Sequence, residues 1–219
     1  MSTISYMNST LRIPLKTNAE QHARLAQLQS TFARVCNAIA PTVQQTKVWN
    51  RVALHHLTYR SLREQFPDMG SQMVCNAIYS VSRTCRMVFQ HPQSPFNTAR
   101  LGAKPLPLLR FSDNCPVYFD RHTMSIKGGQ LSMYTLDGRL RFHLGLKPEV
   151  EQRFHHDKLR EIVLARRGAG YELAFRFDDG QGDAPGPLPA SELPEYVLVK
   201  GVPPPVPAPN KTPDKLRLR

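Results

Sequence analysis

The stretch YRSLREQFPDMGSQMVCNAIYSVSRTCR, residues 59–86, predicts the end of one helix, a turn and a second helix. Residues 67–70 (PDMG) have the composition of a tight turn. Beyond the turn, apolar side chains recur at steps of three and four, the spacing of one buried helix face. Within a predicted helix at residues 72–90, these core positions are Val74, Ile78, Val81, Cys85 and Val88. The stretch therefore predicts a helical hairpin with a well-defined core side.

The second predicted helix has another face, which is polar and contains no acidic residue. Its members are Gln72, Asn76, Tyr79, Ser80, Arg83 and Arg86, with Ser71 as the predicted N-cap. Gln and Asn can form paired hydrogen bonds with adenine, and Arg with guanine or phosphate. We expect this face to contact nucleic acid; a merely solvated face is the alternative. Arg60 and Arg63, on the preceding helix, are expected to contact phosphates.

The charge distribution supports a nucleic-acid partner. The formal net charge is +12. Residues 1–106 contain 12 Lys or Arg against 3 Asp or Glu, whereas residues 107–219 contain 17 against 14, so the balances are +9 and +3. A predicted helical half with so few acids favours a polyanionic partner. The alternative is a basic surface that only maintains solubility, although mixed charges would serve that purpose equally well.

The N-terminal half is predicted to be a short strand followed by three helices. Residues 10–16 alternate apolar and polar side chains, as in a strand with one buried face. Thr17 and Glu20 match the T-x-x-E capping box of a helix start, and Pro41 is predicted to end or kink that helix. Helices at residues 46–66 and 72–90 follow, and prolines between residues 92 and 107 mark a linker.

After residue 107 the pattern changes to short alternating runs separated by Gly-Gly, Asp-Gly and Gly-Ala-Gly turns. This predicts an antiparallel β-barrel or sandwich, joined by the strand at residues 10–16. The expected fold class is α+β: a barrel of residues 1–16 and 107–202, with a helical bundle at residues 17–106 inserted into it. Residues 178–194 are expected to form an acidic loop, and residues 203–219 a Pro-rich, basic tail without fixed structure.

Basic residues at alternating positions of the predicted strands are expected to form a second surface for nucleic acid. They are Arg110, Arg121, Lys127, Arg139 and Arg141. The alternative for these residues is ordinary outward charge on strands whose other face is buried.

Four segments carry a family resemblance: LKTNAEQHARLAQLQSTFARVCNAIA (residues 15–40), LHHLTYRSLREQFPDMGSQMVCNAIYSVSRTCR (54–86), GGQLSMYTLDGRLRFHL (128–144) and KLREIVLARRGAGYELAFRF (158–177). The second contains a Y-x-x-L-R…P-x-x-x-S-Q…A-I pattern and is the most specific match. The third contains a T-x-x-G-R turn at Thr135, Gly138 and Arg139. Together they resemble the N-terminal half of TnpB, a family of RNA-guided nucleases encoded by bacterial insertion sequences and related to type V CRISPR effectors.

The resemblance implies a helical recognition lobe and a wedge-like β-barrel that grip a guide RNA and help to read a short motif in duplex DNA. The family's RuvC nuclease needs three separated acids to hold two metal ions. Residues 195–205 (EYVLVKGVPPP) lie where its first strand is expected but contain no Asp, so we expect no RuvC cleavage by this chain. We expect a nuclease-free protein that binds structured, guide-like RNA and duplex DNA. A RuvC-containing protein in trans, or a second copy in a homodimer, is the expected protein partner.

Two other functions stay open. One is a truncated, transposon-encoded remnant with nonspecific nucleic-acid binding, and the other is a small RNase or toxin that uses scattered His and Arg residues. The adjacent histidines at residues 55–56 and 155–156 point to different sides of a helix or strand, so no metal or cofactor site is predicted. The four cysteines form no C-x-x-C pair and are expected to be reduced. No apolar run is long enough to span a membrane, and we expect a cytoplasmic, nucleoid-associated protein.

Overall fold

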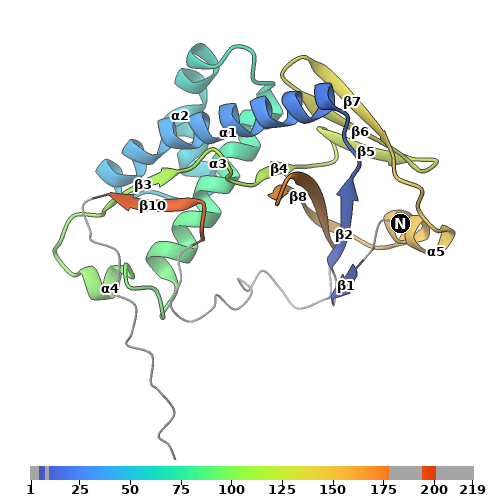
Figure 1. The fold of residues 1–219 in the computed structure, drawn as a ribbon. Helices are drawn as coiled ribbons and strands as arrows, with labels where there is room; N and C mark the ends of the chain where they lie inside the picture. Colours follow the sequence, from blue (N-terminus) through green and yellow to red (C-terminus); the bar gives the residue numbers. More distant parts are fainter. Residues whose placement is uncertain (1–4, 8–9, 178–193, 201–219) are drawn as a thin grey trace, which may run out of the picture.

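The structure is a computed structural model that describes residues 5–7, 10–177 and 194–200. It is an α+β fold in which three antiparallel sheets lie beside a bundle of helices (Figure 1). The predicted fold class is confirmed at this level. The predicted loop at residues 178–194 lies outside the described residues except for Pro194, and the predicted tail at residues 203–219 lies wholly outside them.

The first helix, α1 (Ala19–Thr46), starts one residue later than the predicted capping box implied. The side chain of Asn18 accepts from the backbone N–H of Gln21 at 2.8 Å, and the Gln21 side chain accepts from the Asn18 N–H at 3.1 Å. The expectation for Thr17 and Glu20 is therefore wrong. Asn18 and Gln21 supply the same reciprocal pair of hydrogen bonds, because an amide side chain can replace Glu in a capping box.

Pro41 lies inside α1 and does not end it, so the expectation that the helix ends there is wrong. The helix continues to Thr46 and stops at Lys47, whose φ of 56° is left-handed. An internal proline costs a helix about 3 kcal/mol, mainly through the lost hydrogen bond. The buried residues Ile39 and Val43, which flank Pro41 on the core side, supply the packing that offsets this cost.

The helical hairpin consists of α2 (Arg51–Gln65) and α3 (Ser71–Cys85), and a π-helical turn, η1 (Arg86–Gln90), continues α3. The second helix starts later than predicted, because the side chain of Asn50 caps it by accepting from the N–H groups of residues 52 and 53. Ser71 is the first residue of α3, and Gly70 occupies the N-cap without a side-chain hydrogen bond. The predicted core positions are confirmed as buried: Val74, Ile78, Val81, Cys85 and Val88.

The largest sheet has five strands in the order β1-β2-β9-β8-β4. These are β1 (Ser5–Met7), β2 (Thr10–Leu15), β9 (Gly170–Phe177), β8 (Leu159–Arg167) and β4 (Val117–Phe119). Strand β2 pairs with β9 so that Leu11 faces Phe175 and Ile13 faces Leu173. All four of these side chains are buried, so the N-terminal strand joins the sheet of the second half through the core.

Two smaller sheets complete the strands that the structure describes. One pairs β3 (Leu108–Phe111) with β10 (Val197–Lys200), and the other contains β5 (Met124–Lys127), β6 (Gln130–Thr135) and β7 (Gly138–His143). Gly128 and Gly129, with φ of 58° and 69°, form the two-residue turn between β5 and β6, where both positions require positive φ. No ladder among the described strands closes the sheets into a barrel, so the antiparallel pairing is confirmed and the closure is not found.

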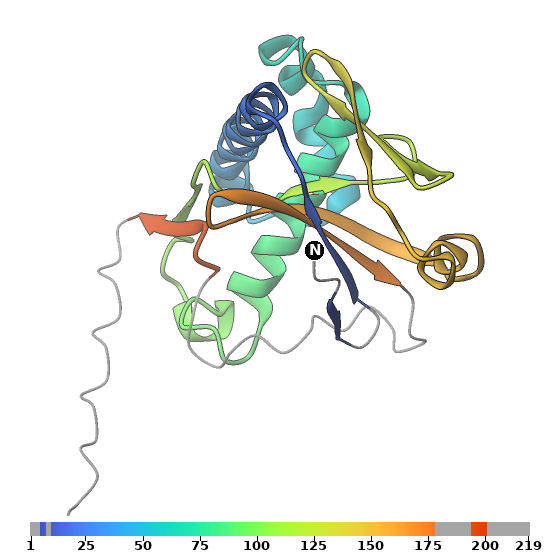
Figure 2. The same cartoon turned by 45° about the vertical axis from the view of Figure 1, so that its right-hand side comes forward.

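Two short helices were not predicted. They are α4 (Thr98–Leu101) and α5 (Pro148–His156), and Pro148 starts α5 at a position where a missing N–H costs nothing. The β5–β7 sheet and α4 lie at opposite ends of the molecule in both views (Figures 1 and 2).

Polar side chains of α1 donate hydrogen bonds to backbone carbonyls between residues 106 and 141. The order of the acceptors along the chain is the reverse of the order of the donors. The donor and acceptor residues are Gln21 to Arg141, Arg24 to Asp137, Gln29 to Cys115, Asn37 to Phe111 and Gln44 to Leu106. A helix rises roughly 35 Å over this span. Helix α1 therefore crosses the molecule and links the β5–β7 sheet to the β3–β10 sheet (Figure 1).

Candidate functional site

The first candidate surface is the outward face of the β5–β6–β7 sheet. On the inward face, Leu131, Met133, Leu140 and Phe142 are at most 5% exposed and pack into the core. The opposite positions in the register point outward. We call these residues the basic sheet face: Ser125, Lys127, Gln130, Ser132, Tyr134, Arg139, Arg141 and His143. None of the three strands contains Asp or Glu, so this face carries one sign of charge.

Tyr134 and Arg139 are directly opposite each other on this face and stack. The guanidinium carbon of Arg139 lies 4.0 Å from the centre of the Tyr134 ring, and Arg139 Nη1 donates to Ser132 Oγ at 3.1 Å. Tyr134 is nevertheless 42% exposed. An exposed ring held by a cation combines a stacking surface with positive charge, which suits contact with a nucleobase and its phosphate.

The turn at residues 120–123 extends the basic sheet face toward the helices. Asp120 Oδ1 accepts from the backbone N–H groups of His122 and Thr123, both at 3.0 Å. Arg139 Nη2 donates to the carbonyl of His122 at 3.4 Å. These bonds fix the turn, which carries the exposed Arg121 and is joined to Arg139 through the carbonyl of His122.

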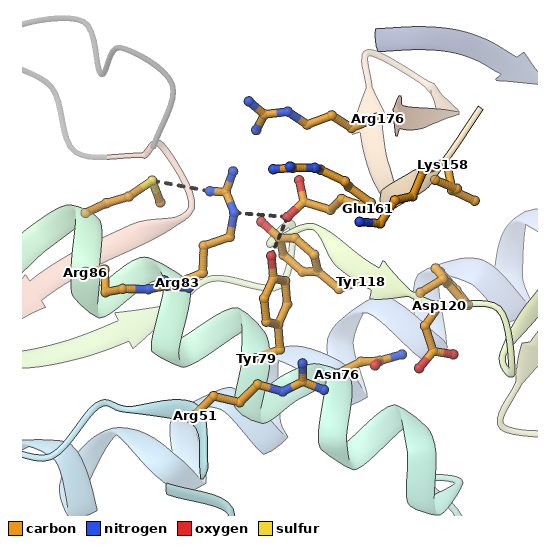
Figure 3. A pocket seen from close by; sticks show the side chains of 14 residues that line it. Arg51, Asn76, Tyr79, Arg83, Arg86, Tyr118, Asp120, Lys158, Glu161 and Arg176 are labelled. Carbon is orange, nitrogen blue, oxygen red and sulfur yellow. Dashed lines mark hydrogen bonds and ion pairs between the residues drawn. The ribbon is translucent and has the colours of Figure 1, made fainter. Parts of the chain in front are cut away.

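The second candidate site is a pocket of about 510 Å³ between α3 and the edge of the sheet formed by β4 and β8 (Figure 3). Its size falls in the range of roughly 300–1,000 Å³ that is usual for small-ligand sites. Its lining contains six Lys or Arg residues and two acids, Asp120 and Glu161, which gives a balance of +4. We call it the cationic pocket; its basic residues are Arg51, Arg83, Arg86, Lys158, Arg160 and Arg176.

Glu161 joins the strand side of the pocket to α3. Its Oε1 accepts from the hydroxyl of Tyr79 at 2.9 Å and from Nε of Arg83 at 3.0 Å. The Arg83 and Glu161 side chains are 22% and 12% exposed, so this ion pair is largely shielded from water. Burial and the negative charge of Glu161 raise the pKa of Tyr79, and burial raises the pKa of the neighbouring Tyr118. Both phenols therefore stay neutral hydrogen-bonding groups at ordinary pH.

Backbone irregularities bring more basic side chains to the pocket than regular elements would. In the β8–β9 ladder, Leu159 faces Phe177 and Glu161 faces Arg176, so a bulge places Arg160 as an extra residue. Four consecutive residues, 158–161, line the pocket, whereas a regular strand would present only alternate ones. On the helix side, Arg86 begins the π-helical turn η1. Such turns often occur at functional sites because they redirect side chains.

The basic residues of the pocket differ in how they are held. The guanidinium carbon of Arg51 lies 5.3 Å from the centre of the Tyr79 ring, and Arg83 is engaged by Glu161. Among the residues that the structure describes, neither Arg86 nor Arg176 forms an ion pair. Arg86 and Arg176 therefore keep charge that is available to an anion.

The predicted polar face of α3 is not an open surface. Asn76 and Ser80 are 5% and 2% exposed, and Asn76 donates to the hydroxyl of Thr123 at 3.4 Å. Gln72 donates to Asp120. The expectation that this face is presented outward is wrong for Asn76 and Ser80, because α3 packs against α1, α2 and β4 and has few free sides. Of the residues predicted on this polar face, those that line the pocket are Asn76, Tyr79 and Arg83 of α3 and Arg86 of the π-helical turn.

The remaining predicted residues of the hairpin are scattered. Arg60 is exposed and pairs with Glu64 at 3.4 Å, and Ser71 is exposed at the start of α3. Arg63 donates to the carbonyl of Met69 and so fastens the end of α2 to the turn before α3. None of these three residues lines the cationic pocket.

The predicted strand residues divide into two groups. Lys127, Arg139 and Arg141 lie together on the basic sheet face, with Arg121 in the adjoining turn. Arg110 lies on β3, in a different sheet, opposite Leu198 of β10. The structure therefore brings four of the five residues together.

Several residues of the two sites were missed. Tyr134 could have been identified from the sequence. It alternates with the apolar Leu131 and Met133, so its side chain must point outward on the same strand. Arg51, Arg176 and Glu161 had no sequence signal, because the pocket is assembled from elements that are far apart along the chain.

No metal centre is visible in the part of the chain that the structure describes: no three His, Cys, Asp or Glu side chains lie close enough to hold an ion. His55 and His56 meet edge to face at 5.9 Å, and His55 stacks on Tyr59 at 4.6 Å. The four cysteines are free thiols. Among the described helices, none is both long enough and apolar enough to cross a membrane.

A scan against protein-family models finds no family that matches this chain, and a search of curated proteins finds no matching sequence.

Proposed function

We propose that the protein binds RNA through the basic sheet face. The observation that carries the proposal is the stacked pair of Tyr134 and Arg139, in a sheet face that contains no acid. On the same face, Arg141 lies next along the ladder, opposite Ser132, and Lys127 lies at the far end, opposite Gln130. Both are exposed, which places positive charge where a phosphate backbone can run along the face.

Single-stranded RNA presents both unstacked bases and charged phosphates. Proteins that bind it on a sheet combine exposed aromatic rings with Lys and Arg, because every base can stack and every phosphate can pair with a cation. A basic surface that serves only solubility does not need an exposed ring and is better built from mixed charges. Tyr134 therefore favours RNA binding over a merely solvated surface.

The resemblance to TnpB supports a more specific form of the proposal. In that form the partner is a structured, guide-like RNA, the antiparallel sheets correspond to a wedge-like barrel, and the complex is directed to duplex DNA by base pairing. The protein acts as a binding subunit without RuvC cleavage of its own, beside a RuvC-containing protein in trans or within a homodimer.

The test is the nucleic acid that co-purifies with the protein from its host. A discrete RNA is expected with the wild-type chain, and it is expected to be lost from the Lys127→Gln/Arg139→Gln variant. The matched control is Arg100→Gln/Lys104→Gln, which also removes one Arg and one Lys charge. These two residues lie on α4 and just after it, at the far end of the molecule (Figures 1 and 2).

Three results would contradict this proposal or its specific form. Wild-type protein that carries no RNA above background would contradict RNA binding, and equal loss in both double variants would contradict a role for the basic sheet face. Heterogeneous nucleic acid in place of a discrete species would favour the transposon-encoded remnant over a guide-dependent protein.

A further inference from the structure

We propose that the cationic pocket binds a phosphomonoester, the terminal phosphate of a nucleic-acid strand. The inference rests on the proposed RNA binding, since it assigns the pocket to the end of the same strand that the basic sheet face holds. The pocket and the face are adjacent along the backbone: Asp120 lines the pocket, and the turn that it begins leads directly into β5.

The charge of the pocket fits a terminal phosphate. Arg51, Arg86 and Arg176 reach the pocket from three different elements, α2, the π-helical turn and β9, and Arg83 adds a fourth guanidinium. A phosphomonoester carries a charge of about −1.5 to −2 and three acceptor oxygens near neutral pH. An internal phosphodiester carries only one negative charge. The four arginines exceed the two acids of the lining, Asp120 and Glu161, by a charge of +2, which is matched better by a strand end.

The shape of the pocket also favours a strand end. It is bounded by α3 on one side and by residues 158–161 of the bulged strand segment on the other (Figure 3). A strand end can enter such a concave site directly. An internal phosphate would need the chain on both sides of it to leave through the same opening.

Glu161 holds two side chains of the pocket in place. Its carboxylate is held by Tyr79 and Arg83 within hydrogen-bonding distance, so an internal anion fixes these two side chains. Arg51, Arg86 and Arg176 form no ion pair among the described residues, and Figure 3 shows Arg86 and Arg176 on opposite sides of Arg83 and Glu161. A terminal phosphate would then be held by arginines that the internal ion pair does not use.

The bound phosphate group can belong to a strand end or to a free nucleotide, and the experiment distinguishes these two ligands. Fluorescence anisotropy is measured with one single-stranded RNA sequence in three forms: 5′-phosphorylated, 3′-phosphorylated and with hydroxyls at both ends. Adenosine monophosphate is tested as a competitor. Wild-type protein is expected to bind one phosphorylated form at least about tenfold more tightly than the hydroxyl form, because charge-assisted hydrogen bonds to phosphate are strong.

Arg86→Gln/Arg176→Gln is expected to abolish that preference and to leave binding of the hydroxyl form unchanged, which also shows that the variant is folded. The matched control, Arg139→Gln/Arg141→Gln, is expected to weaken binding of all three RNA forms by a similar factor and to keep the preference.

Tight binding of all three forms without a preference would overturn the inference and leave the proposed function intact. The inference would also be overturned if adenosine monophosphate displaced the RNA while the protein showed no preference for a phosphorylated strand. The pocket would then bind a free nucleotide and not a strand end. If none of the RNA forms binds, the proposed function fails and the inference fails with it.

Discussion

Arg83 and Glu161 are 78 residues apart in the chain and form an ion pair of 3.0 Å between α3 and β8. The same carboxylate oxygen accepts a hydrogen bond from the hydroxyl of Tyr79. These contacts make Arg83 a residue that holds the helices to the five-stranded sheet, in addition to lining the cationic pocket.

Replacing Arg83 by Ala is therefore expected to lower the free energy of unfolding. Removing one partner of a buried pair leaves the other charge without compensation, and with both side chains mostly shielded we expect a loss of roughly 2–4 kcal/mol. Urea unfolding measures this value. Arg86→Ala, three residues away and exposed, is the matched control and is expected to change stability by less than about 0.5 kcal/mol. Equal effects of the two substitutions would show that the ion pair does not stabilise the fold.

Arg141→Ala is expected to weaken RNA binding and to flatten its dependence on salt. Each phosphate contact on a single strand contributes about 0.7 to the slope of the logarithm of affinity against the logarithm of salt concentration. The slope should therefore fall by about 0.7 in a titration of the variant. Arg100→Ala, on α4 at the other end of the molecule, should leave the slope as it is. An unchanged slope in the Arg141 variant would remove that residue from the interface.

Tyr134→Ala is expected to reduce affinity for single-stranded RNA by about 1–3 kcal/mol, the usual loss when one stacked base loses its ring. Tyr134→Phe keeps the ring and should bind nearly as well as the wild type. Both affinities can be measured by fluorescence anisotropy with the same oligonucleotide. If Phe weakens binding as much as Ala does, the hydroxyl and not the ring makes the contact.

Stability is expected to fall at alkaline pH. Burial raises the pKa of Tyr118 above its ordinary value of 10.0 and raises the pKa of Cys85 from 9.0 to about 12. The folded state thus keeps protons that the unfolded chain releases. Their contribution is fully present below about pH 9 and is lost as the pH rises through the folded-state values.

Urea unfolding at a series of pH values, from neutral upward, measures this decline. Tyr118→Phe removes one of the buried groups that must release a proton, so its stability should decline less steeply than that of the wild type. A stability that stays level through the alkaline range would contradict the assignment of these groups as buried and neutral.

Asn37→Ala is expected to destabilise the fold more than Gln44→Ala. The Asn37 side chain makes two hydrogen bonds of 2.8 Å, to the N–H and to the carbonyl of Phe111, whereas Gln44 makes one, to the carbonyl of Leu106. Leaving two partly buried backbone groups unpaired costs about 2–4 kcal/mol, and leaving one costs about 1–2 kcal/mol. Thermal or urea unfolding of both variants tests the order, and a reversed order would show that Asn37 does not link α1 to β3 as described.

The sequence predicts the individual helices and turns of this protein better than it predicts how they pack against one another. The spacing of Val74, Ile78 and Val81 identifies the core side of α3, because helix periodicity is a local property. The glycines at residues 128–129 identify a hairpin turn for the same reason. By contrast, Pro41 was expected to end or kink α1, and only tertiary packing along that helix explains why the helix does not end there.

The candidate site was predictable in part. Arg139 and Arg141 follow from strand alternation and lie together as expected. Ser80 and Asn76 were expected to face a partner, but elements far along the chain cover them. Local sequence patterns do not show that Glu161 contacts α3, because that contact depends on tertiary packing. The cationic pocket could therefore not be predicted.

The pairing of β2 with β9 has a consequence for synthesis of the protein. Arg12 on β2 and its partner Glu172 on β9 are separated by 160 residues, so a ribosome adding about 5–20 residues per second takes roughly 8–30 s to supply the second strand. Helices α1 to α3 depend mainly on nearer contacts and can form in that interval. During that interval strand β2, with Leu11 and Ile13 that are buried in the folded protein, has β1 as a neighbour but not β9. The nascent chain therefore carries an apolar strand with one open edge for seconds, and such an edge can pair with other chains until β9 is made.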